Sequence, residues 1–250
     1  MSSRLGPVHR PVASPVEGPL SLPVVPYRTR AMEYDGSTNY ALRGGGLTSA
    51  ADGALGMVSF WVQRTATGVH VVADSAPNAS QFAAYFQADH TLRIDGLGAG
   101  LTLISSATFT DDGAFHHCAA GWDVNTGVAW LAADGVDALD VGASTIPSAT
   151  TMDYTHTNWG VGDVTSAGAK LAGYLSELYL STVTYLSLAA AIPRFRLPGG
   201  TPRDLGATGT GPTGAQPIIY MPDDPANNLG FGGDFVNQAA LSVAPVSPSD

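Results

Sequence analysis

Short runs of alternating apolar and polar residues, separated by turn-forming residues, recur between residues 31 and 192 and limit what this chain can fold into. In GMVSFWVQR, at 56–64, Val58, Phe60 and Val62 lie on one face of an extended strand and the residues between them on the other. Further runs follow at intervals of roughly ten residues, among them GVHVVAD, QFAAYFQADHTLRIDG and KLAGYLSELYLS. Asp134-Gly135, between two apolar runs, is a strong hairpin signal. The pattern predicts many short antiparallel strands.

Composition argues against long helices. The chain has 30 glycines, one lysine and three glutamates, and only 13% of its residues are charged. Residues with high helix propensity are therefore scarce. Only LSLAAAIPRF, at 186–195, has a helical pattern, in which Ser187 can cap the helix and Pro193 limits it to about two turns. The expected fold is all-β: an antiparallel two-sheet jelly-roll sandwich with one short helix.

Charge and cysteine content exclude several classes of partner and site. The formal net charge of −10 would repel phosphates, so we expect no nucleic-acid partner. The single cysteine, Cys118, permits neither an internal disulfide nor a cysteine-based zinc cluster. No apolar run approaches the about 18 residues needed to cross a bilayer, so no membrane insertion is expected. Prolines interrupt the N-terminal region, which therefore does not have the pattern of a signal peptide, and synthesis in the cytoplasm is expected.

Residues 1–30 have the composition of an extended arm. Prolines fall at every fourth position from Pro7 to Pro23, and this spacing favours a polyproline-like conformation. The arm contains four arginines and one glutamate, whereas the rest of the chain contains seven basic and twenty acidic residues. We predict that the arm attaches the protein to a partner. The docking residues expected are Arg4, Pro7, Val8, Arg10, Pro11, Val12, Pro15, Val16, Pro19, Leu20, Pro23, Val24, Arg28 and Arg30.

His116, His117 and Cys118 are adjacent and could suggest a reactive centre. Neighbouring residues of a strand point to opposite faces, so the two histidines cannot chelate one metal ion. A buried cysteine behaves as a small hydrophobic residue. We therefore expect a structural role for all three, with no catalytic residue among them.

The order of several motifs resembles the laminin-G-like, concanavalin A-like jelly roll. The motifs are MEYDGSTNYAL, GMVSFWVQR, DDGAFHHCAAGWDVNTGVAWLAADG, NWGVGD and LAGYLSELYLSTVTYLS. Phe115 stands where the family usually has tryptophan, and Cys118 where it usually has valine. The resemblance covers about 33–192 and implies a sandwich domain at 31–192. A Gly/Pro-rich connector at 193–217 follows, and strands at 218–221 and 234–241, within 218–250, are expected to complete the sandwich.

The resemblance also suggests candidate sites. Concanavalin A-like glycosidases carry Glu-x-Asp-x-x-Glu on one strand, but here Thr38 replaces the last acid and Glu177 is alone on its strand, so an enzyme is not expected. A calcium ion at the rim is left open, although turn residues are the favoured interpretation of the loop aspartates Asp111, Asp112, Asp123, Asp137 and Asp163. If the domain binds glycans, exposed aromatic residues would stack on sugar rings. The candidates are Trp61, Tyr154 and Trp159.

The C-terminal block TPRDLGATGTGPTG…PIIYMP…NLGFGGDFVNQAALS resembles a recurrent block in tailed-phage and prophage structural proteins. This resemblance implies a non-enzymatic virion protein, a capsid decoration protein or head spike, bound by its arm to other virion proteins as a homo-oligomer on the particle. The alternative is a carbohydrate-binding module of a tail fibre or tail tip that recognises host surface glycans. A glycoside hydrolase is a third, disfavoured class.

Overall fold

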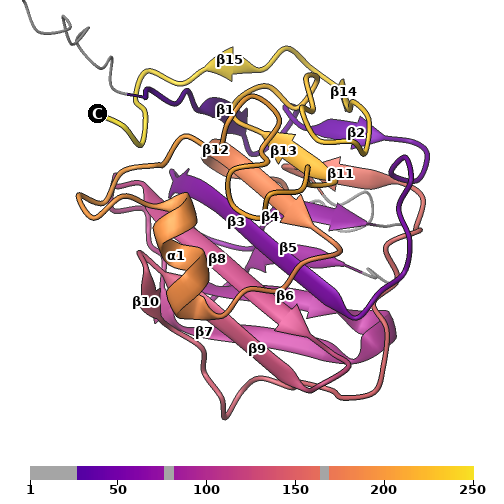
Figure 1. Ribbon diagram of the computed structural model, residues 1–250. Helices are drawn as coiled ribbons and strands as arrows, with labels where there is room; N and C mark the ends of the chain where they lie inside the picture. The colour runs from indigo at the N-terminus through magenta and orange to yellow at the C-terminus, as the bar shows by residue number, and fades with distance from the viewer. Residues whose placement is uncertain (1–26, 76–81, 164–168) are drawn as a thin grey trace, which may run out of the picture.

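The computed structural model describes residues 27–75, 82–163 and 169–250. In this part of the chain, two antiparallel sheets pack face to face and one short helix lies on the outside (Figure 1). The predicted all-β sandwich with a single short helix is confirmed. The predicted docking residues from Arg4 to Val24 lie outside the described residues.

Sheet A has the strand order β10-β9-β8-β3-β12-β1-β15, and β13 also pairs with β12. Its longest strands, β3 and β12, are adjacent at its centre. The strands are β1 (Met32–Asp35), β3 (Leu55–Arg64), β8 (His116–Asp123), β9 (Val128–Ala133), β10 (Val136–Asp137), β12 (Ala172–Ser181), β13 (Ile219–Met221) and β15 (Ser242–Val243).

Sheet B has the order β14-β2-β11-β4-β5-β6-β7. The strands are β2 (Ala41–Arg43), β4 (His70–Ser75), β5 (Ala83–Phe86), β6 (Thr91–Gly96), β7 (Leu101–Thr108), β11 (Trp159–Val161) and β14 (Val236–Asn237), with a 3-10 turn at Leu97–Ala99. The strand expected at 234–241 is only the two-residue β14, and the next two-residue strand, β15, pairs with β1 in the other sheet.

The main core lies between the sheets and follows the alternation of the sequence. Val58, Phe60 and Val62 of β3 belong to it, and so does Cys118 of β8. Phe115 is only half-buried and lies against Tyr174 on the outer side of sheet A, with ring centroids 6.4 Å apart. Although the alternation of 115–122 predicts a strand with Phe115 in the core, Phe115 is not a core residue, because it precedes β8 in the opposite phase to Cys118.

A second apolar cluster covers part of the outer face of sheet A, the face directed away from sheet B. Helix α1 (Leu188–Phe195) supplies Ala191 and Phe195, which pack with Met57, Tyr179 and other residues of the sheet. This covering explains why nearly every residue of β3 is buried on both faces. Ser187 is the N-cap residue but makes no side-chain cap hydrogen bond, and the helix continues two residues past Pro193.

The β9–β10 hairpin turns at Asp134-Gly135, as the sequence predicts. Both residues have positive φ, 50° and 83°, as a two-residue type I′ turn requires. The Asp134 side chain also accepts a hydrogen bond from the backbone N–H of His117 at 2.9 Å. The turn therefore fixes the start of β8.

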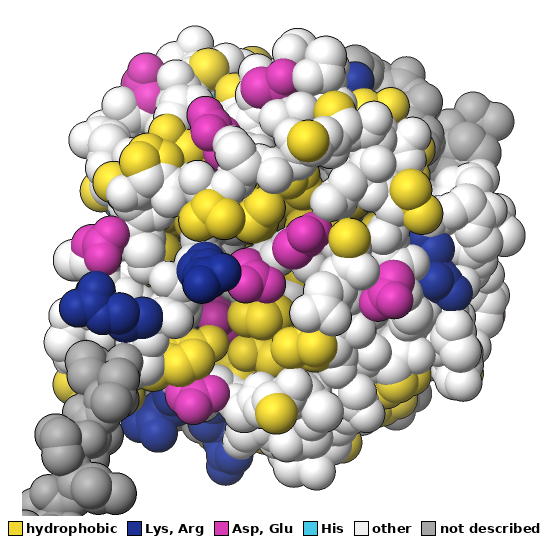
Figure 2. Space-filling view, turned by 90° about the horizontal axis from the view of Figure 1, so that it is seen from above, with side chains coloured by type: hydrophobic (Ala, Val, Ile, Leu, Met, Phe, Trp, Pro, Cys, Tyr) yellow, Lys and Arg dark blue, Asp and Glu magenta, His cyan; other side chains and the backbone are white. Residues whose placement is uncertain are grey.

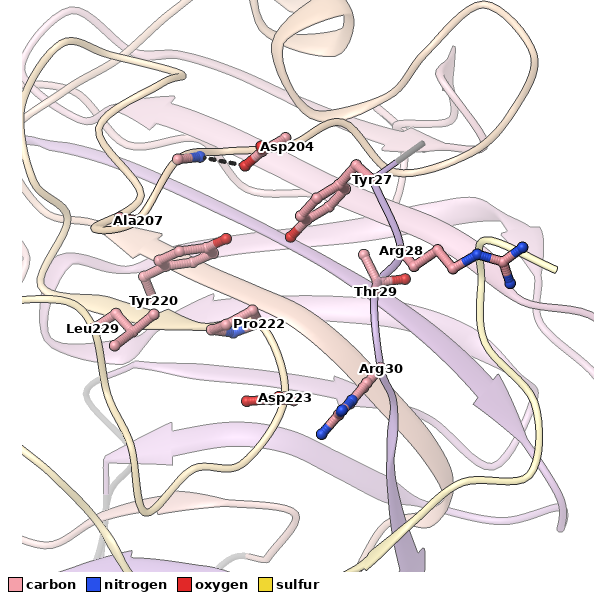
Figure 3. A pocket seen from close by; sticks show the side chains of 11 residues that line it. Tyr27, Arg28, Thr29, Arg30, Asp204, Ala207, Tyr220, Pro222, Asp223 and Leu229 are labelled. Carbon is pink, nitrogen blue, oxygen red and sulfur yellow. Dashed lines mark hydrogen bonds between the residues drawn. The ribbon is translucent and has the colours of Figure 1, made fainter. Parts of the chain in front are cut away.

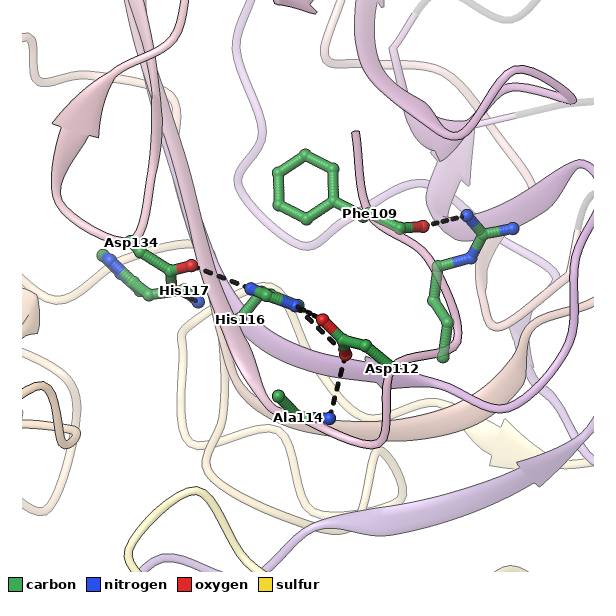
Figure 4. A network of polar contacts seen from close by, with 7 residues as sticks. Phe109, Asp112, Ala114, His116, His117 and Asp134 are labelled. Carbon is green, nitrogen blue, oxygen red and sulfur yellow. Dashed lines mark hydrogen bonds and ion pairs between the residues drawn. The ribbon is translucent and has the colours of Figure 1, made fainter. Parts of the chain in front are cut away.

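His116 joins this turn to the loop before β8 (Figure 4). Its Nδ1 lies 2.8 Å from Asp134 Oδ2, and its Nε2 lies 3.1 Å from Asp112 Oδ2. The hydrogen bond to Asp134 is the largest cause that raises the pKa of His116, with Asp112 adding to it. His117 is fully buried beside Ser59, and burial lowers its pKa to about 3, so it is neutral. Burial also raises the pKa of the Cys118 thiol. This geometry supports structural roles for all three residues.

We expect Phe60→Ala to lower the free energy of unfolding by about 3–5 kcal/mol, because it opens a cavity in the core between the sheets. Phe115→Ala should cost under about 2 kcal/mol, since its ring is half exposed. Urea unfolding of both variants checks this order. Equal losses would show that Phe115 is as important to the core as Phe60.

The pH dependence of stability should reveal the His116 ion pairs. Because the pKa of His116 is raised in the folded state, its contribution is fully present below about pH 6.5 and is lost as the pH rises through the folded value. All three side chains are partly exposed, so the contribution is about 0.5–1 kcal/mol. His116→Gln should therefore destabilise the protein more at pH 5.5 than at pH 8.5, as measured by chemical denaturation. Asp134→Asn should show the same trend, and an equal effect at both pH values would rule out an ionic contribution.

Candidate functional site

Two short strands, β1 and β13, pair with the same edge of β12, and their registers meet at Glu177. The β1 register pairs Met32 with Leu175, and the β13 register pairs Met221 with Leu178. If both registers continued, Arg30 and Pro222 would lie opposite the same residue, Glu177. Pro222 takes that place, because the Glu177 backbone N–H donates to its carbonyl oxygen at 3.2 Å. The chain before β1 must therefore leave the plane of the sheet.

A β-bulge in β12 turns Glu177 away from the core. Leu175 and Leu178 both belong to the core between the sheets, so the two residues between them break the alternation. Glu177 has a φ of +54°, a left-handed conformation that is unfavourable for a side chain with a Cβ. Without the extra residue, Glu177 would point into the core. Bulges that re-aim a side chain are common beside functional sites.

The Glu177 carboxyl is almost fully buried and is held by two tyrosines. Tyr27 Oη donates to Oε1 at 2.5 Å, and Tyr220 Oη donates to Oε2 at 3.2 Å. Burial is the main cause that raises its pKa to about 8, while the two tyrosine hydrogen bonds act in the opposite direction. The nearby carboxylates of Asp204 and Asp223 raise the pKa further.

Both tyrosines line a cavity of about 390 Å³, which is here called the Glu177 pocket after the carboxyl that they bind, although Glu177 itself is not one of its lining residues. Figure 3 shows the Tyr27 and Tyr220 rings on opposite sides of it, with Asp204 and Asp223 on different loops around it. Its lining includes Tyr27, Arg28, Arg30, Asp204, Tyr220 and Asp223. The pocket thus combines aromatic faces with carboxylates and guanidinium groups, a set of groups suited to a hydroxyl-rich ligand.

The segment Tyr27–Arg30 forms one wall of this pocket and is bound to the body. The Thr29 backbone N–H donates to Ser249 Oγ at 3.0 Å, and Ser247 Oγ donates to the Thr29 carbonyl at 2.8 Å. Ser176 Oγ donates to the Arg30 carbonyl at 2.5 Å. Residues 27–30, which the sequence analysis assigned to the arm, therefore contribute to the folded body. Arg28 and Arg30 remain exposed.

A second cavity on the outer side of sheet A has a volume of about 310 Å³ and is here called the Trp61 pocket. Trp61 and Gln63 come from β3, and Phe115 lies just before β8. The C-terminal segment, including Ser247 and Asp250, lines the other side. Aromatic and amide side chains therefore face a wall of mixed character, in which Ser247 and Asp250 stand beside Val246 and Pro248.

Two of the three predicted glycan contacts are wrong. Tyr154 is buried in the core, where its hydroxyl donates to the Leu55 carbonyl and accepts from Trp122 Nε1. Trp159 is also buried, stacked on Phe82, and its Nε1 donates to the His156 carbonyl. Their polar atoms are satisfied internally, so neither ring is available to a sugar. Trp61 is largely buried too, at 3% exposure, but it lines a pocket.

The loop aspartates mostly stabilise turns. Asp123 accepts hydrogen bonds from the backbone N–H groups of Asn125 and Thr126, and Asp137 accepts one from Leu139. Asp112 accepts a hydrogen bond from the Ala114 backbone N–H and forms an ion pair with His116. Asp163 Oδ2 lies 3.9 Å from Lys170 Nζ. Among the described residues, no three His, Cys, Asp or Glu side chains form a group that could hold a metal ion. No helix in the same part of the chain is long and apolar enough to cross a membrane.

Comparison with known proteins rests on structure. No protein-family profile matches the sequence, and no curated protein matches it. A "putative carbohydrate binding protein" from Bacteroides ovatus superposes with a TM-score of 0.61 and 10% identity over 87% of this chain. A heptameric SAP-like pentraxin from Limulus polyphemus gives 0.54 and 14% over 88% of this chain and 96% of its own. The chain has a concanavalin A-like jelly-roll fold.

This likeness concerns the fold alone, because concanavalin A-like jelly rolls carry unrelated functions at these identities. The chain spans 60% of the length of the Bacteroides protein. The phage resemblance has no counterpart among these matches.

Sequence reasoning missed most of the Glu177 pocket. Composition assigns Tyr27 to the arm and Asp204 to the connector. The pattern at 218–221 predicts a strand but gives no sign that Tyr220 belongs to a site. The only available signal was Glu177 itself, the one charged residue of β12. Its tyrosine partners are 150 and 43 positions away along the chain, so no local motif could identify them.

Glu177 should make stability fall with rising pH. Its pKa is raised from 4.5 to about 8 in the folded state, so the unfolded chain releases this proton first. The resulting loss accumulates between about pH 4.5 and 8 and is on the order of a few kcal/mol. In Glu177→Gln this loss should be absent. Thermal unfolding at pH 5 and pH 8.5 checks this, with Glu33→Gln as the matched substitution on β1. A wild-type pH profile retained in Glu177→Gln would contradict the assignment.

Proposed function

We propose that this protein is a carbohydrate-binding module that recognises glycans through the Glu177 pocket. The observation that carries the proposal is the partly buried Tyr27 ring, which lines one open cavity together with two carboxylates, Asp204 and Asp223. Aromatic faces pack against the C–H faces of sugars, and carboxylates accept hydrogen bonds from sugar hydroxyls. The structural match to a protein described as carbohydrate-binding supports this choice.

Binding without hydrolysis is part of the proposal. Both oxygens of the Glu177 carboxyl already accept hydrogen bonds from tyrosines, so neither is presented to a glycosidic oxygen. The pocket lining also favours an uncharged ligand, because it carries two guanidinium groups, of Arg28 and Arg30, and two carboxylates, of Asp204 and Asp223. Figure 2, which views the molecule from the top of Figure 1, shows both signs of charge interspersed among hydrophobic side chains. A host surface glycan is the expected target.

The test is a pair of substitutions at Tyr27. Tyr27→Ala removes the ring from the pocket wall, and we expect it to weaken glycan binding by tenfold or more, or about 1.4 kcal/mol. Tyr27→Phe keeps the ring and removes only the hydroxyl, so it should bind nearly as well. A glycan array identifies the ligand, and isothermal titration calorimetry measures both variants. Equal affinities for wild type and Tyr27→Ala would place any glycan site elsewhere.

Attachment to a virion through residues 1–26 is a second candidate function. The feature that favours it is the docking of Tyr27–Arg30 on the body, near the C-terminal end of the chain (Figure 1). Any segment attached before Tyr27 is therefore joined to the body at this point. In this proposal the protein is a decoration protein, spike or tail component in contact with other virion proteins.

Deletion of residues 2–26, with Tyr27 retained, should leave the fold and the glycan affinity intact and abolish incorporation into particles. Particle occupancy is measured by gel densitometry or electron microscopy. Wild-type occupancy of the shortened protein would show that the body, and not the arm, is the attachment surface.

A further inference from the structure

The Trp61 pocket is separate from the Glu177 pocket and has no part in the proposed glycan site. The two share no lining residue, and the segments Tyr27–Arg30 and 246–250 are joined by the Thr29 contacts with Ser247 and Ser249. Its volume of about 310 Å³ is at the lower end of the range for ligand pockets, about 300–1,000 Å³. It therefore has room for a single sugar unit and not for a long chain segment.

Gln63 is the most buried polar side chain of this pocket. Its side chain is about nine-tenths buried, and its Oε1 has no hydrogen-bond partner. A buried amide oxygen without a partner is unfavourable, and such groups call for an explanation. Turning this amide toward a ligand would break no hydrogen bond of its oxygen. A primary amide offers one acceptor and two donors side by side, so it can pair with a second amide through two parallel hydrogen bonds.

Aromatic side chains stand beside this amide. Trp61 precedes Gln63 on β3 by two residues and therefore lies on the same face of the strand. Its ring is supported by His117, with ring centroids 5.0 Å apart, and Phe115 completes this side of the pocket. The indole and phenyl rings provide an apolar surface for a methyl group or for the C–H face of a sugar ring.

The remaining wall selects against anions. Asp250 lines the pocket, and its Oδ2 accepts a hydrogen bond from the Ser247 backbone N–H at 2.8 Å. A carboxylate in this place repels carboxylate, sulfate and phosphate ligands. The Asp250 carboxylate can accept hydrogen bonds from hydroxyl groups, whereas Ser247 Oγ already donates to the Thr29 carbonyl and accepts from the Ser249 backbone N–H.

We infer that the Trp61 pocket is a second binding site, for an acetamido sugar. The Gln63 amide pairs with the acetamido N–H and C=O, the methyl group packs on Trp61 and Phe115, and the ring hydroxyls face Asp250. The choice of a sugar as the carrier of the acetamido group rests on the proposed function. The site itself rests on the partnerless amide and the rings beside it.

The experiment titrates the full-length protein with N-acetyl-D-glucosamine, D-glucose and Nε-acetyl-lysine by isothermal titration calorimetry. N-acetyl-D-glucosamine should bind at least tenfold more tightly than the other two. Gln63→Met keeps the length of the side chain and removes the amide, so it should weaken this binding tenfold or more. Phe115→Ala, at a half-exposed position, should also weaken it. Thermal unfolding confirms that both variants are folded.

Tyr27→Ala separates this inference from the proposed function. It should leave the affinity for N-acetyl-D-glucosamine unchanged, because Tyr27 lines only the other pocket. Affinity lost in Tyr27→Ala and kept in Gln63→Met would overturn the second site while supporting the Glu177 pocket. Failure of N-acetyl-D-glucosamine to bind, equal binding of D-glucose, or tighter binding of Nε-acetyl-lysine would each overturn the inference.

Discussion

Competition for one edge of β12 determines how this jelly roll is built around its candidate site. Strands β1 and β13 approach the same edge from opposite ends, and their registers meet at Glu177. Backbone groups at a sheet edge must find partners, and only one strand can supply them at each position. Because Pro222 pairs with Glu177, the segment before β1 rises over the outer face of sheet A. The bulge, the left-handed Glu177 and the wall formed by Tyr27–Arg30 are all consequences of this arrangement.

The outer face of sheet A then needs a cover that the sandwich alone does not provide. Its central residues include Ser59, Trp61 and His117, which are neither fully apolar nor suited to open solvent. Helix α1 covers one part, and the segments Tyr27–Arg30 and 246–250 cover another. The fit is incomplete, since His117 Nδ1 and Gln63 Oε1 are buried without partners among the described residues. Ordered water satisfies such atoms in many proteins, and a ligand can do the same where a cavity is present.

The sequence predicted the parts of this structure that depend on local patterns. The alternation in 56–64 is that of β3, and Asp134-Gly135 forms the expected turn. Local patterns failed where the environment is set by distant residues. Trp159 belongs to a three-residue strand, too short to show which face is buried, and Tyr154 lies in an irregular segment. Exposure of an aromatic ring in such segments depends on what packs over it, and here Phe82 and Trp122 do so.

The boundary between arm and body also depends on distant residues that local sequence patterns do not reveal. Composition places it after Arg30, because the prolines and arginines end there. Hydrogen bonding shows that Tyr27 and Thr29 belong to the body, because they bind side chains more than 100 positions away. A chain that began at Ala31 would expose the Glu177 carboxyl to solvent on one side and leave Tyr220 as its single phenol partner. Its pKa would then fall toward the usual value, since burial is what raises it. Tyr27, which composition assigns to the arm, therefore also helps to set the protonation state of the acid that the two pocket tyrosines bind.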